Sequence, residues 1–234
     1  MEESMVVTDR EALGRLLLEA QGRRDERLAF MIGRPLAASL SDGRLRDWLD
    51  MLLPMAQGRS IHLCRERSGD WRVVLHLRYR MGVRVADAYR RGDLCSLIPE
   101  EREALDRTLA IVATAREGAS DPLVLGQSLF DAVRSCAVYE NPALGSAAHR
   151  GVVSAASVLV GGRGNCQGFA DAYYLLGSLA GLAVRYQAGF KGRAAHLWNL
   201  LLVDGDWQTV DVTSGAFLPE GAELAALGLS MGCL

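Results

Sequence analysis

The chain has 234 residues, of which 50% are hydrophobic and 23% charged, and its formal net charge is −2. This is enough apolar material for one globular unit or two small ones. The near balance of charges gives no global basic field of the kind that attracts nucleic acid, so we expect no nucleic-acid partner. The basic residues are almost all arginine, because Lys191 is the only lysine, and we interpret the arginines as solvated or paired.

The cysteines and the N-terminal residues indicate the cellular compartment in which the protein is expected. The cysteine count is odd and no CxxC pair occurs, which favours a reducing compartment over a disulfide scaffold. The first residues, "MEESMVVTDREALG", are acidic and lack the apolar core of a signal peptide, and no run of about 18 apolar residues could span a membrane. We therefore expect a cytoplasmic protein without a membrane span. An exported protein whose signal had been removed would have the same features, and the sequence leaves the oligomeric state open.

The first predicted elements form a small α+β unit. Thr8 and Glu11 have the spacing of a capping box, which predicts a helix over residues 9–21. The run "RLAFMIG" predicts a short strand. A second helix is expected after Asp42, a cap residue, because the apolar residues that follow it have helical spacing: Leu45, Trp48, Leu49 and Leu52.

A hairpin follows this second helix. The segments "SIHLCRE" and "WRVVLHLRYR" alternate around the turn "RSGD". His62 and His76 lie within these strands, with no cysteine or carboxylate placed to join them, so we interpret them as ordinary sheet positions. Residues 1–98 are thus expected to form a small α+β N-terminal domain of unknown role, and residues 99–234 a second domain.

Two helix signatures open the second half of the chain. "SLIPEEREALDRTLAIVATARE" has Pro99 near its first turn and acids beside its N-terminus. "SDPLVLGQSLFDAVRSCAVYE" repeats the pattern, with Leu125, Leu129 and Val133 on one face.

The stretch "GRGNCQGFADAYYLL" places Cys166 directly after a glycine-rich turn and a good N-cap, Asn165. A helix is expected from there to about Gly181. A thiol in the first turn lies at the positive end of the helix dipole, which lowers its pKa. The placement predicts that Cys166 is a thiolate nucleophile.

Three strands are expected after this helix, over residues 183–190, 196–203 and 207–213. If Asp204 and Gly205 form a two-residue turn, the positions of the last two strands that pair sum to 409. His196 and Asp211 then share one face as diagonal neighbours, within reach of each other. A slip of one residue would put Asp211 on the opposite face.

Cys166, His196 and Asp211 have the chemistry of a nucleophile, its base and the group that orients the base. The contact between Cys166 and His196 does not follow from spacing, because it depends on the fold. We expect no metal at these residues, since no second cysteine or histidine lies at ligand spacing, and no other cofactor.

The segments "GRGNCQGFADAYYLLGSLAG" and "HLWNLLLVDGDWQTVDVTSG" resemble the transglutaminase-like superfamily of papain-type cysteine enzymes, particularly its bacterial members. That family has a glycine-flanked Cys at a helix start, a His-x-Trp-Asn strand and a Trp-x-x-Val-Asp-x-Thr strand. This chain has all three in order, separated by 30 and 15 residues. The resemblance, which covers about residues 99–220, implies an α+β fold with the catalytic helix packed on an antiparallel sheet. It also implies Cys166, His196 and Asp211 as the catalytic set.

The resemblance further implies an oxyanion hole built from the Cys166 backbone N–H and an upstream side chain. Tyr139 in "VYEN" is the candidate, with packing at a helix end as its alternative, and Gln167 is a weaker candidate. Trp198 and Asn199 are expected to support the site, although Trp198 fits plain sheet packing equally well.

Members of this family include crosslinking enzymes, peptidases, deamidases, amide hydrolases and inactive proteins. The resemblance implies that an active member forms a thioester at its cysteine, which water or an amine resolves. The chain has no accessory β-domain and no D-x-[DN]-x-[DN]-G calcium loop, which favours a small hydrolase acting on a peptide or protein substrate. A protein-glutamine transamidase and a non-catalytic interaction module stay as alternatives.

Overall fold

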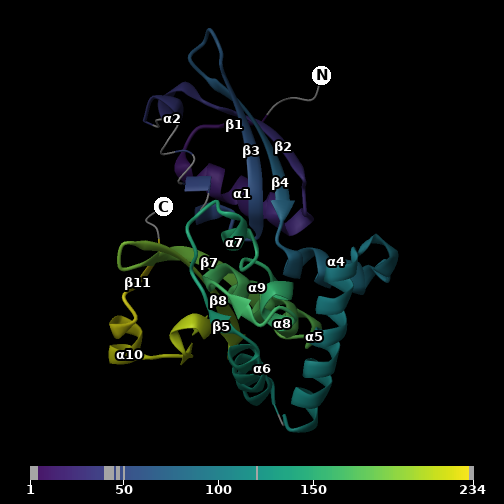
Figure 1. The fold of residues 1–234 in the computed structure, drawn as a ribbon. Helices are drawn as coiled ribbons and strands as arrows, with labels where there is room; N and C mark the ends of the chain where they lie inside the picture. Colours follow the sequence, from purple (N-terminus) through teal and green to yellow (C-terminus); the bar gives the residue numbers. More distant parts are fainter. Residues whose placement is uncertain (1–4, 40–44, 46–47, 50, 120, 232–234) are drawn as a thin grey trace. The chain divides into compact units, whose positions relative to one another are not determined.

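A computed structural model describes residues 5–39, 45, 48–49, 51–119 and 121–231 (Figure 1). The chain divides into two compact units, one ending at Tyr79 and the other spanning Arg80–Met231. The first unit ends at Tyr79, before the boundary that the sequence predicted at residue 98. The reason is that the helix that follows Arg80 packs on the other helices of the second unit. Among the described residues, no helix has both the length and the apolar character needed to cross a lipid bilayer.

The first unit contains a sheet of four strands in the order β1-β2-β4-β3. Its elements are β1 (Val6–Val7), α1 (Arg10–Arg23), β2 (Arg27–Ile32), α2 (Arg34–Ser39), β3 (Ala56–Arg65) and β4 (Trp71–Tyr79). β3 and β4 form the expected antiparallel hairpin, while the short β1 pairs in parallel with β2. One side of β2 and β4 is buried, as their alternating apolar residues require.

Two details of the first unit bear on the sequence predictions. The expected cap at Thr8 is wrong, because Asp9 caps α1 and its carboxylate accepts from the Ala12 N–H at 2.8 Å. Asp9 competes successfully because it directly precedes the first helical residue. The expected cap at Asp42 lies outside the described residues, whereas Leu45 and Leu49 are buried as their spacing predicts.

The second unit begins with helices. They are α4 (Met81–Arg91), the 3₁₀ turn η1 (Leu94–Ser96), α5 (Pro99–Glu117), α6 (Pro122–Cys136), α7 (Ala147–Arg150) and α8 (Ala155–Leu159). Two short strands, β5 (Val138–Tyr139) and β6 (Arg163–Gly164), pair in parallel and lead to α9 (Cys166–Leu179). The face of α6 predicted from Leu125, Leu129 and Val133 is buried.

Helix α9 is the centre of this unit. Every residue from 168 to 177 is buried, and the helix packs against α4, α5, α6, α8 and strands β7 and β8. A helix that is apolar around its whole circumference requires neighbours on all sides, which explains this position. It ends at Leu179, two residues before the expected Gly181.

The sheet of the second unit has five strands in the order β10-β9-β8-β7-β11, and all of its neighbouring pairs are antiparallel. The strands are β7 (Val184–Lys191), β8 (Ala194–Val203), β9 (Asp206–Asp211), β10 (Ala216–Phe217) and β11 (Leu229–Met231). A 3₁₀ turn, η2 (Val212–Ser214), and a helix, α10 (Gly221–Ala226), complete the unit. The predicted α+β class is confirmed, with a buried helix packed on an antiparallel sheet.

The register of β8 and β9 is the predicted one. Leu200 pairs with Thr209 and Val203 with Asp206, so the pair numbers sum to 409 as expected. The turn residues Asp204 and Gly205 both have positive φ, 52° and 92°, which matches a two-residue hairpin turn. The expected extension of the last strand to residue 213 is wrong, because the chain turns into η2 after Asp211.

Candidate active site

Cys166 is the first residue of α9. Asn165 caps this helix as predicted, because its side-chain oxygen accepts from the N–H groups of Gln167 at 2.9 Å and Gly168 at 3.2 Å. The capping leaves the positive end of the helix beside the thiol. The flanking glycines are required for packing, since a Cβ at Gly168 would lie 2.5 Å from the Val152 carbonyl oxygen.

His196 and Asp211 meet where β8 begins and β9 ends. The His196 Nε2 lies 2.8 Å from Asp211 Oδ2, and both side chains are buried. Asp211 also caps η2, accepting from Thr213 Oγ1 at 2.7 Å, from the Ser214 N–H at 3.3 Å and from the Ser214 hydroxyl. These hydroxyl and N–H donors hold the carboxylate in place, and its pKa is lowered to about 2, because its hydrogen bonds outweigh burial, which alone would raise it.

The side chain of His196 bridges the other two residues. With Nε2 directed to Asp211, its Nδ1 is the ring nitrogen left for the hydrogen bond that His196 also makes with Cys166. Burial alone would lower the pKa of His196, but the hydrogen bonds to Asp211 and Cys166 and their negative charges raise it to about 9. The imidazole is therefore protonated near neutral pH.

The pKa of Cys166 shifts in the opposite direction. Burial by itself would raise it, but the hydrogen bond with His196, the Leu197 backbone N–H and the positive charges of His196 and Arg80 lower it below its ordinary value. The arrangement thus favours a thiolate and imidazolium pair oriented by a carboxylate, which is the charge state of an activated cysteine nucleophile.

Two predicted oxyanion candidates lie close to this group. Tyr139 pairs with Gly164 across β5 and β6, and its ring stacks on Phe169 with centroids 6.5 Å apart. Burial and then the charges of Cys166 and Asp211 raise the pKa of Tyr139, so its hydroxyl stays neutral and able to donate. Gln167 is half-buried, and its Oε1 accepts from Arg80 Nη1 at 3.2 Å. The oxyanion role of either side chain stays a prediction.

Trp198 and Asn199 have different surroundings. The buried Trp198 ring stacks on the His196 ring, with centroids 5.8 Å apart, and packs closely on Gly189, where a Cβ would lie 2.6 Å from the indole. Asn199 is fully buried, and its Nδ2 lies 3.5 Å from the Arg185 carbonyl oxygen. Trp198 thus fits both expected readings, support of the imidazole and sheet packing.

Sequence reasoning missed a second polar group beside the nucleophile. Asp171 on α9 is completely buried, Tyr186 on β7 donates to it at 2.7 Å, and the buried Arg80 lies near both. One signal could have found it. Asp171 is the only charged residue in the apolar helical run "CQGFADAYYLLGSL", and a buried carboxylate requires partners.

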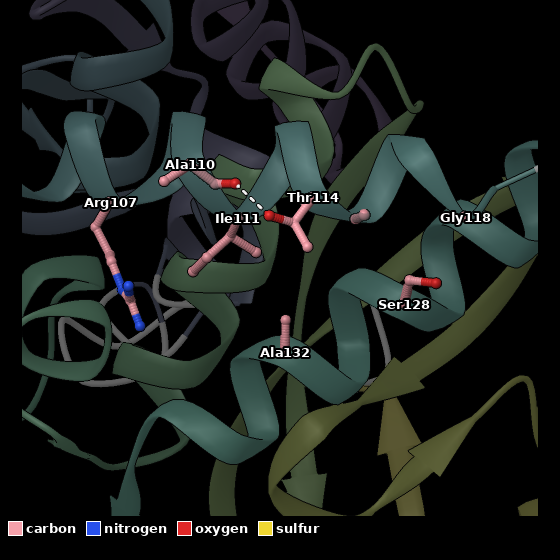
Figure 2. A pocket seen from close by; sticks show the side chains of 8 residues that line it. Arg107, Ala110, Ile111, Thr114, Gly118, Ser128 and Ala132 are labelled. Carbon is pink, nitrogen blue, oxygen red and sulfur yellow. Dashed lines mark hydrogen bonds between the residues drawn. The ribbon is translucent and has the colours of Figure 1, made fainter.

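This unit has a recess at the candidate site and a cavity between two of its helices. The small recess is lined by residues of α9, β8 and the β9–η2 junction, among them Cys166, Trp198 and Asp211. A cavity of about 430 Å³ lies between α5 and α6, where small facing side chains such as Ala115, Ser128 and Ala132 leave space (Figure 2). None of the predicted site residues lines this second cavity.

Among residues that the structure describes, no group of three or more His, Cys, Asp or Glu side chains is placed to hold a metal ion.

Comparisons with known proteins indicate which family the chain is similar to. The sequence model of the Transglutaminase-like superfamily matches residues 110–212, a span that contains Cys166, His196 and Asp211. A search of curated proteins finds no match to the chain. Among solved structures, one described as the crystal structure of a TGase has a TM-score of 0.45 at 12% identity, and the match covers 94% of this chain and 61% of that chain.

The periplasmic domain of TgpA from Pseudomonas aeruginosa, solved bound to ethylmercury, has a TM-score of 0.37 at 19% identity. That match covers 61% of this chain and 55% of the TgpA chain, so this chain spans little more than half the length of that structure. The family that the motifs resemble is the one whose sequence model matches. Through residues 110–212, the chain is similar to the transglutaminase-like superfamily.

Proposed function

We propose that the second unit is a cysteine-dependent acyl-transfer enzyme that cleaves peptide or amide bonds with water. The observation that carries this proposal is the position of His196, which makes one hydrogen bond to Asp211 and another to Cys166 at the start of α9. A buried histidine held between a carboxylate and a half-buried thiol has the arrangement of a nucleophile, base and orienting group.

In this mechanism the Cys166 thiolate attacks the carbonyl carbon of the substrate amide. The tetrahedral oxyanion is stabilised by the Cys166 backbone N–H and a side-chain donor, for which Tyr139 and Gln167 are the candidates. The His196 imidazolium then gives its proton to the leaving amine as the carbon–nitrogen bond breaks, and a thioester remains on Cys166. Water, deprotonated by the now neutral His196, attacks the thioester, and the acid product leaves with the thiolate restored.

The test is incubation of the full chain with a peptide library that contains glutamine side chains, with and without a primary amine, followed by mass spectrometry of the products. Hydrolysis gives backbone cleavage or a gain of about 1 Da at an amide, whereas transamidation gives an amine adduct. Cys166→Ala should abolish either product, because the nucleophile is lost. Cys136→Ser, at the other half-buried cysteine of this unit, is the matched control and should keep activity.

The same protein supports a second measurement that needs no substrate. Cys166 should react with iodoacetamide near pH 6 faster than Cys64, Cys95 and Cys136, since among these described cysteines only its thiol has the helix start and His196 beside it. His196→Ala should remove this selectivity. If the alkylation rate of Cys166 depends on pH as that of an ordinary thiol does, and His196→Ala does not change it, the proposal is contradicted. That result would favour a non-catalytic interaction module.

A further inference from the structure

Arg80 is a buried arginine next to the candidate nucleophile. It lies directly before α4, and only 6% of its surface is exposed. Its Nη1 donates to Gln167 Oε1 at 3.2 Å, and its guanidinium lies 5.7 Å from the centroid of the Tyr186 ring. Gln167 directly follows Cys166, so Arg80 places a positive charge beside the first turn of α9.

The position of Arg80 is maintained by Asp171, which lies on α9 one turn after Gln167. The Asp171 carboxylate accepts from the N–H groups of Gly82 at 3.0 Å and Ala155 at 2.9 Å, and from the Tyr186 hydroxyl at 2.7 Å. It therefore joins the start of α4 and the start of α8 to α9. All three of these contacts are donors to the carboxylate and favour its ionised form. Burial raises the pKa of Asp171, and the charge of Arg80 and these hydrogen bonds oppose that shift, so the carboxylate and the guanidinium stabilise each other's charge.

The contact around Gly82 is too close for any other residue. A Cβ at this position would lie 2.8 Å from both the Asp171 backbone oxygen and Oδ1. The close approach of α4 to α9 brings Arg80 to the level of Cys166.

The chemistry of the guanidinium determines what Arg80 does there. Arginine has donors only and stays charged, so it orients the Gln167 amide with its carbonyl inward and its NH₂ group directed away. A fixed charge in a buried setting also interacts strongly with a nearby thiolate. The other ionisable groups around Cys166 and Arg80 are His196 on β8, Asp211 on β9, Tyr186 on β7 and Tyr139 on β5.

We propose that Arg80 is a positioning residue for Cys166, which orients Gln167 and supplies, together with His196, the positive charge that keeps the thiol ionised. The contribution of Arg80 to catalysis rests on the proposed function. Its effect on the ionisation of the Cys166 thiol does not, because that effect is measured without a substrate. The role is specific to the guanidinium charge, and not to the packing of the side chain.

The experiment measures the alkylation rate of Cys166 by iodoacetamide against pH, by mass spectrometry of the modified peptide. Arg80→Gln removes the charge but keeps hydrogen-bonding groups for Asp171 and Gln167. We expect its alkylation rate at pH 6 to fall about three- to tenfold, because its profile moves to higher pH by about half to one unit. Arg80→Lys keeps the charge and should restore most of the rate.

Arg84→Gln is the matched control. Arg84 lies on α4, the helix that Arg80 precedes, is partly buried, and pairs with Glu101. Its variant should leave the alkylation profile unchanged. If Arg80→Gln does not fold, as judged by circular dichroism, the double variant Arg80→Gln/Asp171→Asn removes both charges together and should show the same lowered rate.

The outcomes separate this inference from the proposed function. An Arg80→Gln profile that coincides with that of the unmodified protein overturns the inference, even if the protein cleaves amides. A lowered rate in Arg80→Gln with recovery in Arg80→Lys supports it, even if no amide is cleaved. An equal loss in Arg84→Gln also overturns it, since the effect would then be structural.

Discussion

At the scale of single residues, the charges of the candidate site meet at His196. Its side chain is 8% exposed, yet its pKa is raised to about 9, because the hydrogen bonds and negative charges of Asp211 and Cys166 outweigh the cost of burial. Asp211 in turn is held by the hydroxyl groups of Thr213 and Ser214. The expected consequence is an imidazolium that persists to alkaline pH and loses its proton as the pH rises through about 9.

Asp211→Asn tests this consequence. In the unmodified enzyme, activity should fall as the pH rises through about 9, because His196 then loses the proton that the leaving amine requires. The amide lacks the negative charge that raises the pKa of His196, so the alkaline limb should move to lower pH. Turnover should also fall roughly 10²–10⁴-fold.

The measurement is kcat/KM against pH for both proteins, with the alkylation rate of Cys166 as the control. Alkylation requires only the thiolate, so it should not fall above pH 9 in either protein. An alkaline limb at the same pH in Asp211→Asn would show that the carboxylate does not set the pKa of His196.

At the scale of elements, the β8–β9 hairpin determines whether His196 and Asp211 can meet. Its register follows from the Asp204–Gly205 turn, where both residues have positive φ. A shift by one residue would move Asp211 to the other face of the sheet. The turn therefore contributes to the site although it lies far from the thiol along the strands.

Gly205→Ala should destabilise the protein by about 1 kcal/mol, because an L-residue at φ 92° is strained. Gly118→Ala is the control: neither glycine has an atom within 4 Å of an added Cβ, but Gly118 has φ −102°. Urea unfolding measures both free energies. Equal values for the two variants would show that the turn conformation contributes nothing to stability.

At the scale of the whole molecule, the two units carry different chemistry. The residues of the candidate site all belong to the unit that spans Arg80–Met231. In the first unit, His62 and His76 are exposed on β3 and β4, with ring centroids 6.1 Å apart. We propose that the N-terminal part of the chain serves substrate selection or shielding, and supplies no catalytic group.

The double variant His62→Ala/His76→Ala should therefore keep kcat/KM within about twofold of the unmodified enzyme, since exposed substitutions away from a site have small effects. Circular dichroism and thermal unfolding confirm the fold. A loss of about a hundredfold with folding intact would place a catalytic group in the first unit and contradict this division of roles.

The sequence by itself determined the parts of the site that depend on local chemistry. The N-cap at Asn165, the helix from Cys166 and the hairpin turn at Asp204–Gly205 follow from residues adjacent in the chain, and the turn predicts the register of β8 and β9. The cap at Thr8 was wrong because Asp9 directly precedes the first helical residue and accepts from the Ala12 N–H. The last strand was predicted too long, since the side chain of Asp211 bonds to Ser214 and turns the chain.

Only the tertiary structure decided which distant residues meet. The contact between Cys166 and His196 requires α9 to pack on β8, and no local pattern specifies that distance. The same is true of Arg80, which reaches Gln167 across 87 positions of sequence. Burial is the physical reason: a charged group removed from water is stable only beside partners that the fold brings to it, and those partners lie far away in the chain.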